Sequence, residues 1–339
     1  MKTRFKTLLS LVALPLMTEA LTTESIAQPA PLIELEDFFK NPEEAGHALS
    51  PSGDHILFLK PWESRMNVWV QPTSGGEAQR VTSVTERDIP FAFWANDQVI
   101  AFGLDEGGDE NFHVFLVSKE GGEAEDITPY EETRASVIDV LERDPERLLL
   151  SHNQRNKQVF DLYRFHIPTR TATLVVENPG NYVGYVADHE GKVRVATAND
   201  GVNAQILYRK TEEDPFEVIL TTNFRETMEP TFFTFDNERL YAYSDLGRDK
   251  KALVVFDPET ATETEVLYEH PQVDVESVLA SQKRELVTGV AFTAAKQAYH
   301  FFDETRAQMQ RDLEAQTFHA QMGAAILQSF QEKCCGSSS

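Results

Sequence analysis

Short runs of apolar residues recur along this chain at a nearly constant step of about 46 residues, the length range of a structural repeat. One set of runs contains Val68, Val114, Leu162, Leu207, Leu253 and His300. A second set precedes the first with a similar step, starting at Ile56, Val99, Leu148, Val193, Leu240 and Leu286. The tetrapeptide Gly-Gly-Glu-Ala also occurs twice, at Gly75 and Gly121. Two independent sets of runs with one period indicate a unit repeated six times.

Each unit reads as several short β-strands separated by turn residues, such as Ser52-Gly53-Asp54 and Asp144-Pro145-Glu146. Strands of this length, repeated every 40 to 50 residues or so, are typical of propeller blades, which are four-stranded antiparallel sheets. The pattern therefore predicts an all-β fold, a β-propeller of about six recognisable four-stranded blades over residues 45–303. A solenoid of helical repeats is excluded because no helical periodicity precedes residue 303 or so.

The pattern changes to helical spacing after Asp303, and we expect a helical tail over residues 304–333. The apolar positions at this spacing include Met309, Leu313, Ala320, Ala324 and Leu327. We expect Met309, Leu313, Ala324, Leu327 and Phe330 either to cover an open flank of the propeller or to lie detached from it. Residues 334–339 are expected to form a disordered terminus.

The first 27 residues have the pattern of a secretory signal peptide. Three basic residues precede an apolar stretch from Leu8 to Met17, and Ser25 to Ala27 offer small residues for cleavage. This stretch is too short to span a bilayer, which needs about 20 residues. The prediction is an exported protein, periplasmic or secreted, with a lead-in segment at residues 28–44; an N-terminal helix of a cytosolic protein is the alternative.

The net charge and the cysteine content indicate which partners the protein can bind and which interactions stabilise the fold. The chain has 31 Lys and Arg against 55 Asp and Glu, a net charge of −24. Such a field repels nucleic acid and anionic lipid, so we predict no nucleic-acid partner and no membrane span. The two cysteines, Cys334 and Cys335, are adjacent. Packed sheets rather than spaced disulfides must therefore hold the fold together.

Acidic residues are concentrated at Asp105, Glu106, Asp109 and Glu110. Carboxylates at this density can bind Ca²⁺, but an EF-hand loop needs oxygen ligands at set alternating positions and a terminal Glu. That spacing is absent here, so the prediction is an exposed hairpin loop.

The sequence contains no recognisable set of catalytic residues. The 339 residues contain no Gly-x-Ser-x-Gly nucleophile motif, and none of the nine histidines forms a His-Glu-x-x-His pair. We therefore predict no catalytic, cofactor-binding or metal-ligating residues, no cofactor, and no catalytic triad in this chain. Most of the histidines are expected at the surface or facing a sheet.

Several segments in order resemble a known family. The turn Ser50-Pro51-Ser52-Gly53-Asp54 resembles the one that opens blades in TolB-like proteins and in prolyl-oligopeptidase-type (S9) serine peptidases. The Trp-led run from Phe93, the Gly107 to Asn111 turn and Ile127-Thr128-Pro129 follow in the order of the peptidase propeller. Phe301-Phe302-Asp303-Glu304 resembles a late segment of it. The resemblance covers about residues 32–316.

The resemblance implies a non-catalytic, substrate-gating propeller whose partners are short peptides or a hydrolase domain. In the family, at least one more blade and an α/β-hydrolase domain would follow, whereas this chain becomes helical. We therefore expect that the chain is truncated before the catalytic domain and is inactive alone. The alternatives are a stand-alone TolB-like exported propeller that binds a protein or polymer, and a metal-dependent propeller enzyme such as a lactonase. The oligomeric state is not predicted.

Overall fold

The computed structural model describes residues 32–316, which divide into two compact units at Lys40. In the first unit, the short 3₁₀ helix η1 (Leu35–Phe38) lies within a segment whose large apolar side chains are exposed. The expected signal peptide, the part of the tail beyond residue 316 and the terminus at 334–339 lie outside the described residues. The second unit, from Asn41, contains every β-strand that is described.

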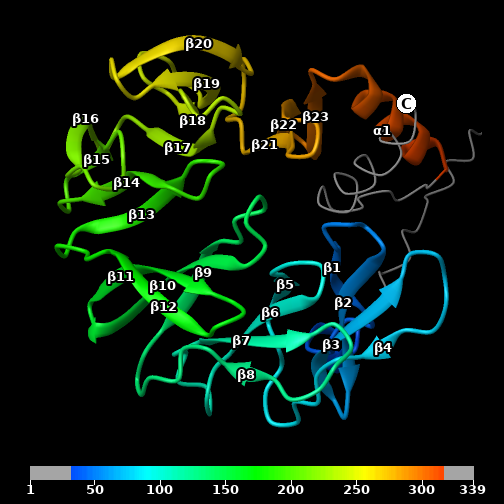
Figure 1. Ribbon diagram of the computed structural model, residues 1–339. Coiled ribbons are helices and arrows are strands. Elements are labelled where there is room, and N and C mark those ends of the chain that lie inside the picture. Colours follow the sequence, from blue (N-terminus) through cyan, green and yellow to red (C-terminus); the bar gives the residue numbers. More distant parts are fainter. Residues whose placement is uncertain (1–31, 317–339) are drawn as a thin grey trace, which may run out of the picture. The chain divides into compact units, whose positions relative to one another are not determined.

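The second unit is a β-propeller of six antiparallel sheets that follow one another in chain order (Figure 1). Blade 1 contains β1 (Ala45–Leu49), β2 (His55–Trp62), β3 (Arg65–Pro72) and β4 (Gln79–Arg80); blade 2 contains β5 (Ala92–Trp94), β6 (Val99–Leu104), β7 (His113–Ser118) and β8 (Glu125–Asp126). Blade 3 contains β9 (Ala135–Asp139), β10 (Arg147–Asn156), β11 (Val159–His166) and β12 (Thr171–Val176); blade 4 contains β13 (Tyr182–Ala187), β14 (Val193–Asn199), β15 (Asn203–Tyr208) and β16 (Glu217–Asn223). Blade 5 contains β17 (Met228–Phe233), β18 (Leu240–Ser244), β19 (Ala252–Asp257) and β20 (Thr262–Tyr268), and blade 6 contains β21 (Ser277–Ser281), β22 (Leu286–Thr293) and β23 (Gln297–Phe301).

The predicted repeat is confirmed strand by strand. The residues Val68, Val114, Leu162, Leu207, Leu253 and His300 all fall in the third strand of their blades, and the second set of runs starts the second strands. Within residues 32–316 the sixth sheet has three strands, whereas the prediction gave every blade four. After β23 the chain turns directly into helix α1 (Glu304–Gln316).

Neighbouring blades share their apolar cores, which explains why some strands are apolar at consecutive positions. Along β10, Leu148 and Leu150 pack in a cluster with residues of blade 2, whereas Leu149 packs in a cluster with Val193 of blade 4. The residues from Ala252 to Phe256 on β19 are likewise all buried. Successive side chains of a strand point to opposite faces, so a sheet covered on both sides needs apolar residues on both.

The antiparallel order gives the propeller two distinct faces. The side of the propeller that carries the turns between the first and second strands of each blade is called the turn face. The opposite side, called the linker face, carries the turns between the second and third strands and the linkers that join one blade to the next. On the turn face, consecutive blades are joined by hydrogen bonds from Ser52 N to Asp97 Oδ1 (2.7 Å) and from His189 N to Asn237 Oδ1 (2.9 Å). These partners are 45 and 48 residues apart, one repeat each.

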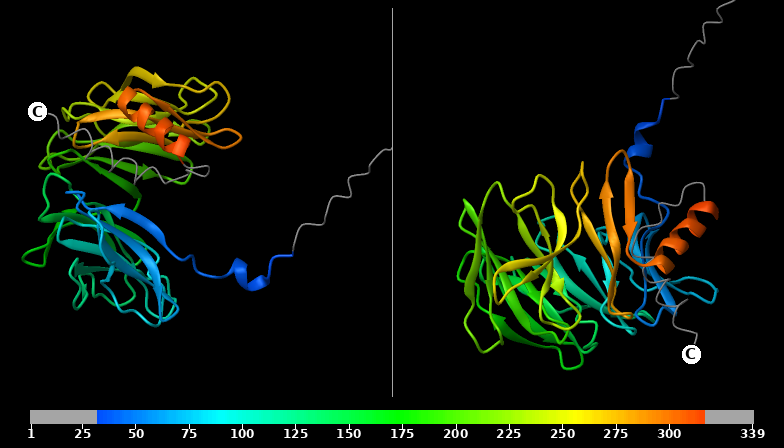
Figure 2. Two further views of the ribbon diagram at one scale, coloured as in Figure 1. Left: turned by 90° about the vertical axis from the view of Figure 1, so that its right-hand side faces the viewer. Right: turned by 90° about the horizontal axis from the view of Figure 1, so that it is seen from above.

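Helix α1 lies beside β23 (Figure 2). Asp303 caps the helix by accepting a hydrogen bond from Arg306 N (2.8 Å), and its carboxylate also pairs with Arg284. The buried residues of α1 are Arg306, Ala307 and Gln310, whereas Met309 and Leu313 are only half-buried. The apolar stripe expected from the sequence is therefore not the most buried face of the described helix. Ala320, Ala324, Leu327 and Phe330 lie outside the described residues.

Candidate functional site

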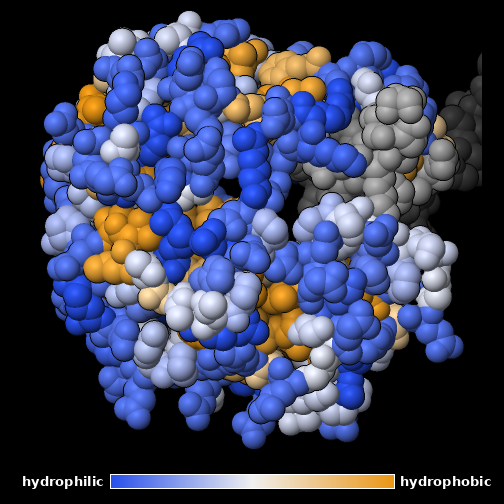
Figure 3. All heavy atoms as spheres, viewed as in Figure 1, coloured by the Kyte–Doolittle hydropathy of each residue, from blue (hydrophilic) through white to orange (hydrophobic). Residues whose placement is uncertain are grey.

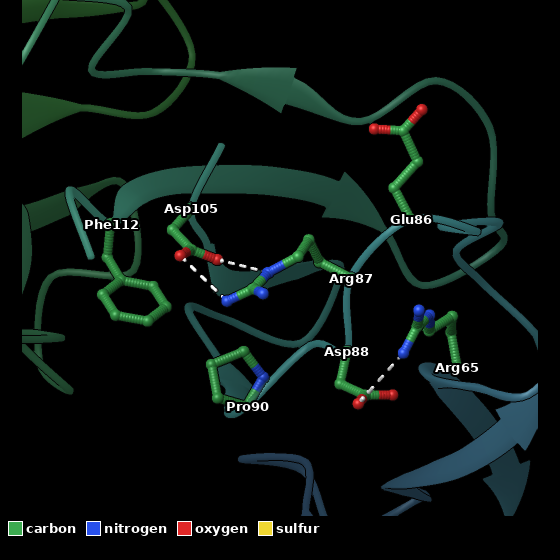
Figure 4. A pocket seen from close by; sticks show the side chains of 7 residues that line it. All are labelled: Arg65, Glu86, Arg87, Asp88, Pro90, Asp105 and Phe112. Carbon is green, nitrogen blue, oxygen red and sulfur yellow. Dashed lines mark hydrogen bonds and ion pairs between the residues drawn. The ribbon is translucent and has the colours of Figure 1, made fainter. Parts of the chain in front are cut away.

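A cavity of about 260 Å³ opens between blades 1 and 2 (Figure 4). Three segments meet there: the first residue of β3, the linker between β4 and β5, and the loop between β6 and β7. The lining residues are Arg65, Glu86, Arg87, Asp88, Pro90, Asp105 and Phe112. The β2–β3 turn, the linker and the β6–β7 loop all belong to the linker face, so the cavity opens on that side of the propeller.

A two-point ion pair closes one side of the cavity. Arg87 Nε donates to Asp105 Oδ1 and Arg87 Nη2 donates to Asp105 Oδ2, each over 3.1 Å. Asp105 is only 5% exposed, and its Oδ2 also accepts a hydrogen bond from Glu110 N. Guanidinium and carboxylate match in this geometry, which makes the pair stronger and more directional than a single contact. The pair therefore ties the linker to the β6–β7 loop.

A second carboxylate holds the linker against blade 1. Asp88 Oδ1 accepts hydrogen bonds from Met66 N (2.7 Å) and from Asn41 Nδ2 (3.2 Å). Arg65 Nη1 lies 3.9 Å from Asp88 Oδ2, a longer contact than the Arg87 pair. Arg65 Nε donates to the carbonyl of Thr85 in the same linker. Asp88 is thus a fixed part of the cavity wall.

The remaining wall is apolar. Pro90 and Phe112 line it, and the ring of Phe91 lies 6.3 Å from that of Phe112. Phe91 also rests on Gly103 of β6, where an added Cβ would come within 2.2 Å of the ring. Only glycine leaves that space free at the present ring position. The cavity therefore combines charged pairs with an aromatic wall.

The acidic residues of the β6–β7 loop are exposed, as predicted, with one exception. Glu106, Asp109 and Glu110 are exposed as expected, but the prediction is wrong for Asp105, which is buried because Arg87 reaches it from the neighbouring linker. The carboxylate of Asp109 accepts two hydrogen bonds from Asn111, which hold the pKa of Asp109 below its usual range. Within residues 32–316, no group of three or more His, Cys, Asp or Glu side chains is arranged to hold a metal ion.

The lining of the cavity contains none of the usual nucleophiles of acyl transfer. Its described members are Arg, Glu, Asp, Pro and Phe, none of which is the hydroxyl or thiol nucleophile that acyl transfer uses. No catalytic, cofactor or metal residue was predicted for this chain, so the cavity itself is what sequence reasoning missed. Its parts lie in three segments, and only the acidic loop was singled out in advance.

A contact between opposite blades crosses the ring on the turn face. Arg143, in the turn between β9 and β10, donates from Nη2 to Glu285 Oε1 in the turn between β21 and β22, over 2.5 Å. Blades 3 and 6 lie opposite each other in a six-blade order, and the two turns approach each other near the middle of the ring in Figure 1. Both side chains are about half-exposed. The pair narrows this mouth of the ring.

One buried histidine also escaped prediction. His152 of β10 is 2% exposed, its ring stacks on that of Tyr163 at 4.0 Å, and the tilted ring of Tyr130 lies 5.3 Å away. Its Nδ1 atom has no hydrogen-bond partner among the described residues. Burial lowers the pKa of His152, although the carboxylate of Asp161 partly opposes that effect. The only sequence signal was its position two residues after the apolar run Leu148–Leu150.

Comparison with known proteins places these blades in a family. Dipeptidyl aminopeptidase BIII of Pseudoxanthomonas mexicana is 32% identical to this chain over 260 residues, which cover 74% of this chain and 37% of that protein. The chain's blades are homologous to the propeller of the S9 peptidases. Dipeptidyl peptidase family member 6 of Caenorhabditis elegans is 25% identical over 295 residues, covering 79% of this chain and 38% of that protein.

A solved structure shares the fold of this propeller. The structure of a prolyl endopeptidase matches with a TM-score of 0.57 at 11% identity, covering 75% of this chain and 40% of that one, a likeness that shows the fold alone. The chain spans less than two fifths of the length of the curated relatives it matches. No family model matches the chain. In residues 32–316, no helix is long and apolar enough to cross a membrane.

Proposed function

We propose that this chain serves as the non-catalytic propeller of an S9-type serine peptidase and limits which peptides reach a catalytic domain. The observation that carries the proposal is the 32% identity to dipeptidyl aminopeptidase BIII over 260 residues. The 339 residues contain no Gly-x-Ser-x-Gly motif, so nucleophile, base and orienting acid would come from a separate hydrolase segment. The stand-alone TolB-like propeller remains the alternative prediction, and no specific observation favours it.

Two measurements test this function. The purified chain should not be labelled stoichiometrically by a fluorophosphonate, because it brings no activated serine. In a chimera, this chain would replace the matched region of dipeptidyl aminopeptidase BIII. The chimera should hydrolyse a short chromogenic dipeptide substrate while rejecting long peptides and casein. Labelling that disappears on mutation of one serine would overturn the non-catalytic role, and casein hydrolysis at the rate of the short substrate would overturn the gating role.

We also propose export to the periplasm or the medium, from the signal-peptide pattern of residues 1–27. N-terminal sequencing of the chain recovered from an expressing bacterium should begin after Ala27. An intact Met1 terminus on cytosolic protein would contradict this proposal.

A further inference from the structure

The outer strand of blade 3 differs from the outer strands of the other four-stranded blades. Strand β12 (Thr171–Val176) is the last strand of its sheet, and within residues 32–316 no strand pairs with its outer edge. An unpaired edge is a template for another strand, and natural proteins protect such edges with charged side chains or keep them very short. The strands β4 and β8 have two residues each, β16 carries Glu217, and β20 carries Glu263 and Glu265. In contrast, β12 has six residues and no charged side chain.

The register of blade 3 shows which backbone groups of β12 face outward. Ile167 N bonds back toward the β10 side of the sheet, so the backbone groups of the preceding residue, His166, face β12. His166 lies opposite Thr171, and inward and outward groups alternate along an antiparallel strand. The N–H and C=O groups of Ala172 and Leu174 therefore point away from β11. Both residues are exposed, so another strand can reach this edge.

We propose that β12 is a self-association edge, on which β12 of a second copy of this chain adds in antiparallel orientation. The two strands would be related by a two-fold axis, and the register that uses every outward group sets Ala172 opposite Leu174 of the second copy. Each such pair exchanges two hydrogen bonds, and Thr173 meets its own copy at the axis in the closer, non-hydrogen-bonded type of pair. The extra residue of the register shift in β12 is Val175, which lies beyond this stretch.

The charges at the two ends of β12 favour a second copy as the occupant. Arg170 precedes the strand and Glu177 follows it, and their side chains are 41% and 64% exposed although they pair with Glu125 and Arg155. In the antiparallel pairing, each Arg170 lies next to Glu177 of the other copy, so opposite charges meet at both ends of the paired strands. A parallel second strand would set like charges side by side.

The rest of the surface offers little competition to this edge. Figure 3 shows a mostly hydrophilic face, on which apolar side chains form separate groups rather than one broad patch. The net charge of −24 repels a second copy at long range, but physiological salt screens charges that are more than about 8 Å apart. One short edge buries less surface than a standard interface, so we expect a weak dimer with a Kd on the order of 100 μM.

Disulfide trapping tests the pairing and its register. Thr173→Cys would be made in a chain in which Cys334 and Cys335 are replaced by Ser. Residues in the closer type of antiparallel pair have Cα atoms about 4.5 Å apart, within disulfide range, so mild oxidation near the Kd should convert most of this variant to a covalent dimer. Thr171→Cys is the matched control, since Thr171 is also exposed and lies on the same face of β12. It would face Val175 of the second copy and should cross-link about tenfold more slowly.

Sedimentation velocity measures the same association without a cross-link. The unmodified chain should show a dimer fraction that rises with concentration. Leu174→Lys places a charge in the interface twice per dimer and should raise the Kd at least about tenfold. Val218→Lys adds the same charge to the outer strand of blade 4, where the valine is 51% exposed, and should leave the Kd unchanged.

The results that would overturn the self-association edge are distinct. A chain that stays monomeric up to roughly 1 mM has no such edge. Equal cross-linking of Thr171→Cys and Thr173→Cys would reflect random collisions, which do not select a register. A dimer that Leu174→Lys leaves intact would be joined by another surface. If Leu174→Lys does not fold, the comparison of the two cysteine variants decides alone.

Discussion

At the scale of single residues, Asp105 is a carboxylate whose partner comes from the linker between blades 1 and 2. Its side chain is buried, whereas that of Arg87 is 45% exposed, so solvent reaches one half of the pair. The sequence showed the four acidic residues but not their unequal environments, because burial of Asp105 depends on a linker that is 18 residues away. A local sequence pattern predicts a turn and cannot predict which of its side chains a neighbouring segment will cover.

Removal of Arg87 should therefore cost more than removal of Arg65. Arg87→Ala leaves Asp105 buried with only the Glu110 amide as a donor, and we expect a loss of about 1–3 kcal/mol in the free energy of unfolding. Arg65→Ala removes a 3.9 Å contact between half-exposed groups and an exposed hydrogen bond to the carbonyl of Thr85, with an expected loss below about 1 kcal/mol. Urea denaturation measures both. Asp105→Asn in the Arg87→Ala background should recover part of the loss, and equal effects of the two arginine variants would contradict this account.

His152 should make the stability of the protein depend on pH. Its pKa is lowered in the folded state by burial, so the folded form binds the proton less readily than the unfolded chain, whose value is about 6.5. The stabilising effect of the neutral ring is present above that value and is lost as pH falls below it, by at most about 1.4 kcal/mol per pH unit. Tyr130, Tyr163 and Asp161 are the groups that face the ring.

Thermal unfolding between pH 8 and pH 5 or so tests this expectation. His152→Phe keeps an aromatic ring in the stack but cannot titrate, so its melting temperature should fall less steeply with acid than that of the unmodified chain. Identical profiles for the unmodified chain and His152→Phe would assign the acid sensitivity to other groups.

At the scale of elements, the strands were predictable because each blade repeats one amphipathic pattern. The second and third strands are the most buried, and these are the ones the two sets of apolar runs located. The outer strands are short or exposed, such as β4 with two residues, and leave little pattern in the sequence. The three-stranded form of blade 6 was not predicted, because whether a fourth strand follows β23 depends on tertiary pairing.

Blade 6 should be sensitive to a single methyl group. An added Cβ at Gly289 of β22 would lie 2.5 Å from the backbone oxygen of His300, on the paired strand β23. At Gly103 of β6 the added atom meets the side chain of Phe91, which is 43% exposed and can swing away. We expect Gly289→Ala to lose about 1–3 kcal/mol and Gly103→Ala to lose less. Denaturant unfolding of both variants measures the two losses in the free energy of unfolding. A larger loss for Gly103→Ala than for Gly289→Ala would show that the Phe91 ring is held rigidly.

At the scale of the whole molecule, the sequence predicts the ring but not what lies inside or across it. Each shared core cluster joins consecutive blades, as for Leu57 of blade 1 with Ile100 of blade 2, and consecutive contacts follow from a fixed repeat. The cavity needs three segments together, and the Arg143 to Glu285 pair joins residues 142 positions apart. No local pattern encodes such contacts, because they depend on how far the ring curves over several blades.

The pair across the ring should contribute little to stability and respond to salt. Both side chains are about half-exposed, so the Coulomb energy is screened and offset by the entropy of fixing two long side chains. Arg143→Ala and Glu285→Ala should each lose less than about 1 kcal/mol, and the difference from the unmodified chain should vanish in high salt. Arg170→Ala is the matched control, since Arg170 pairs with Glu125 between consecutive blades at similar exposure. If Arg143→Ala loses much more free energy of unfolding than Arg170→Ala at any salt concentration, the contact between Arg143 and Glu285 holds opposite blades together. The narrowed mouth of the ring would then be a rigid part of the fold.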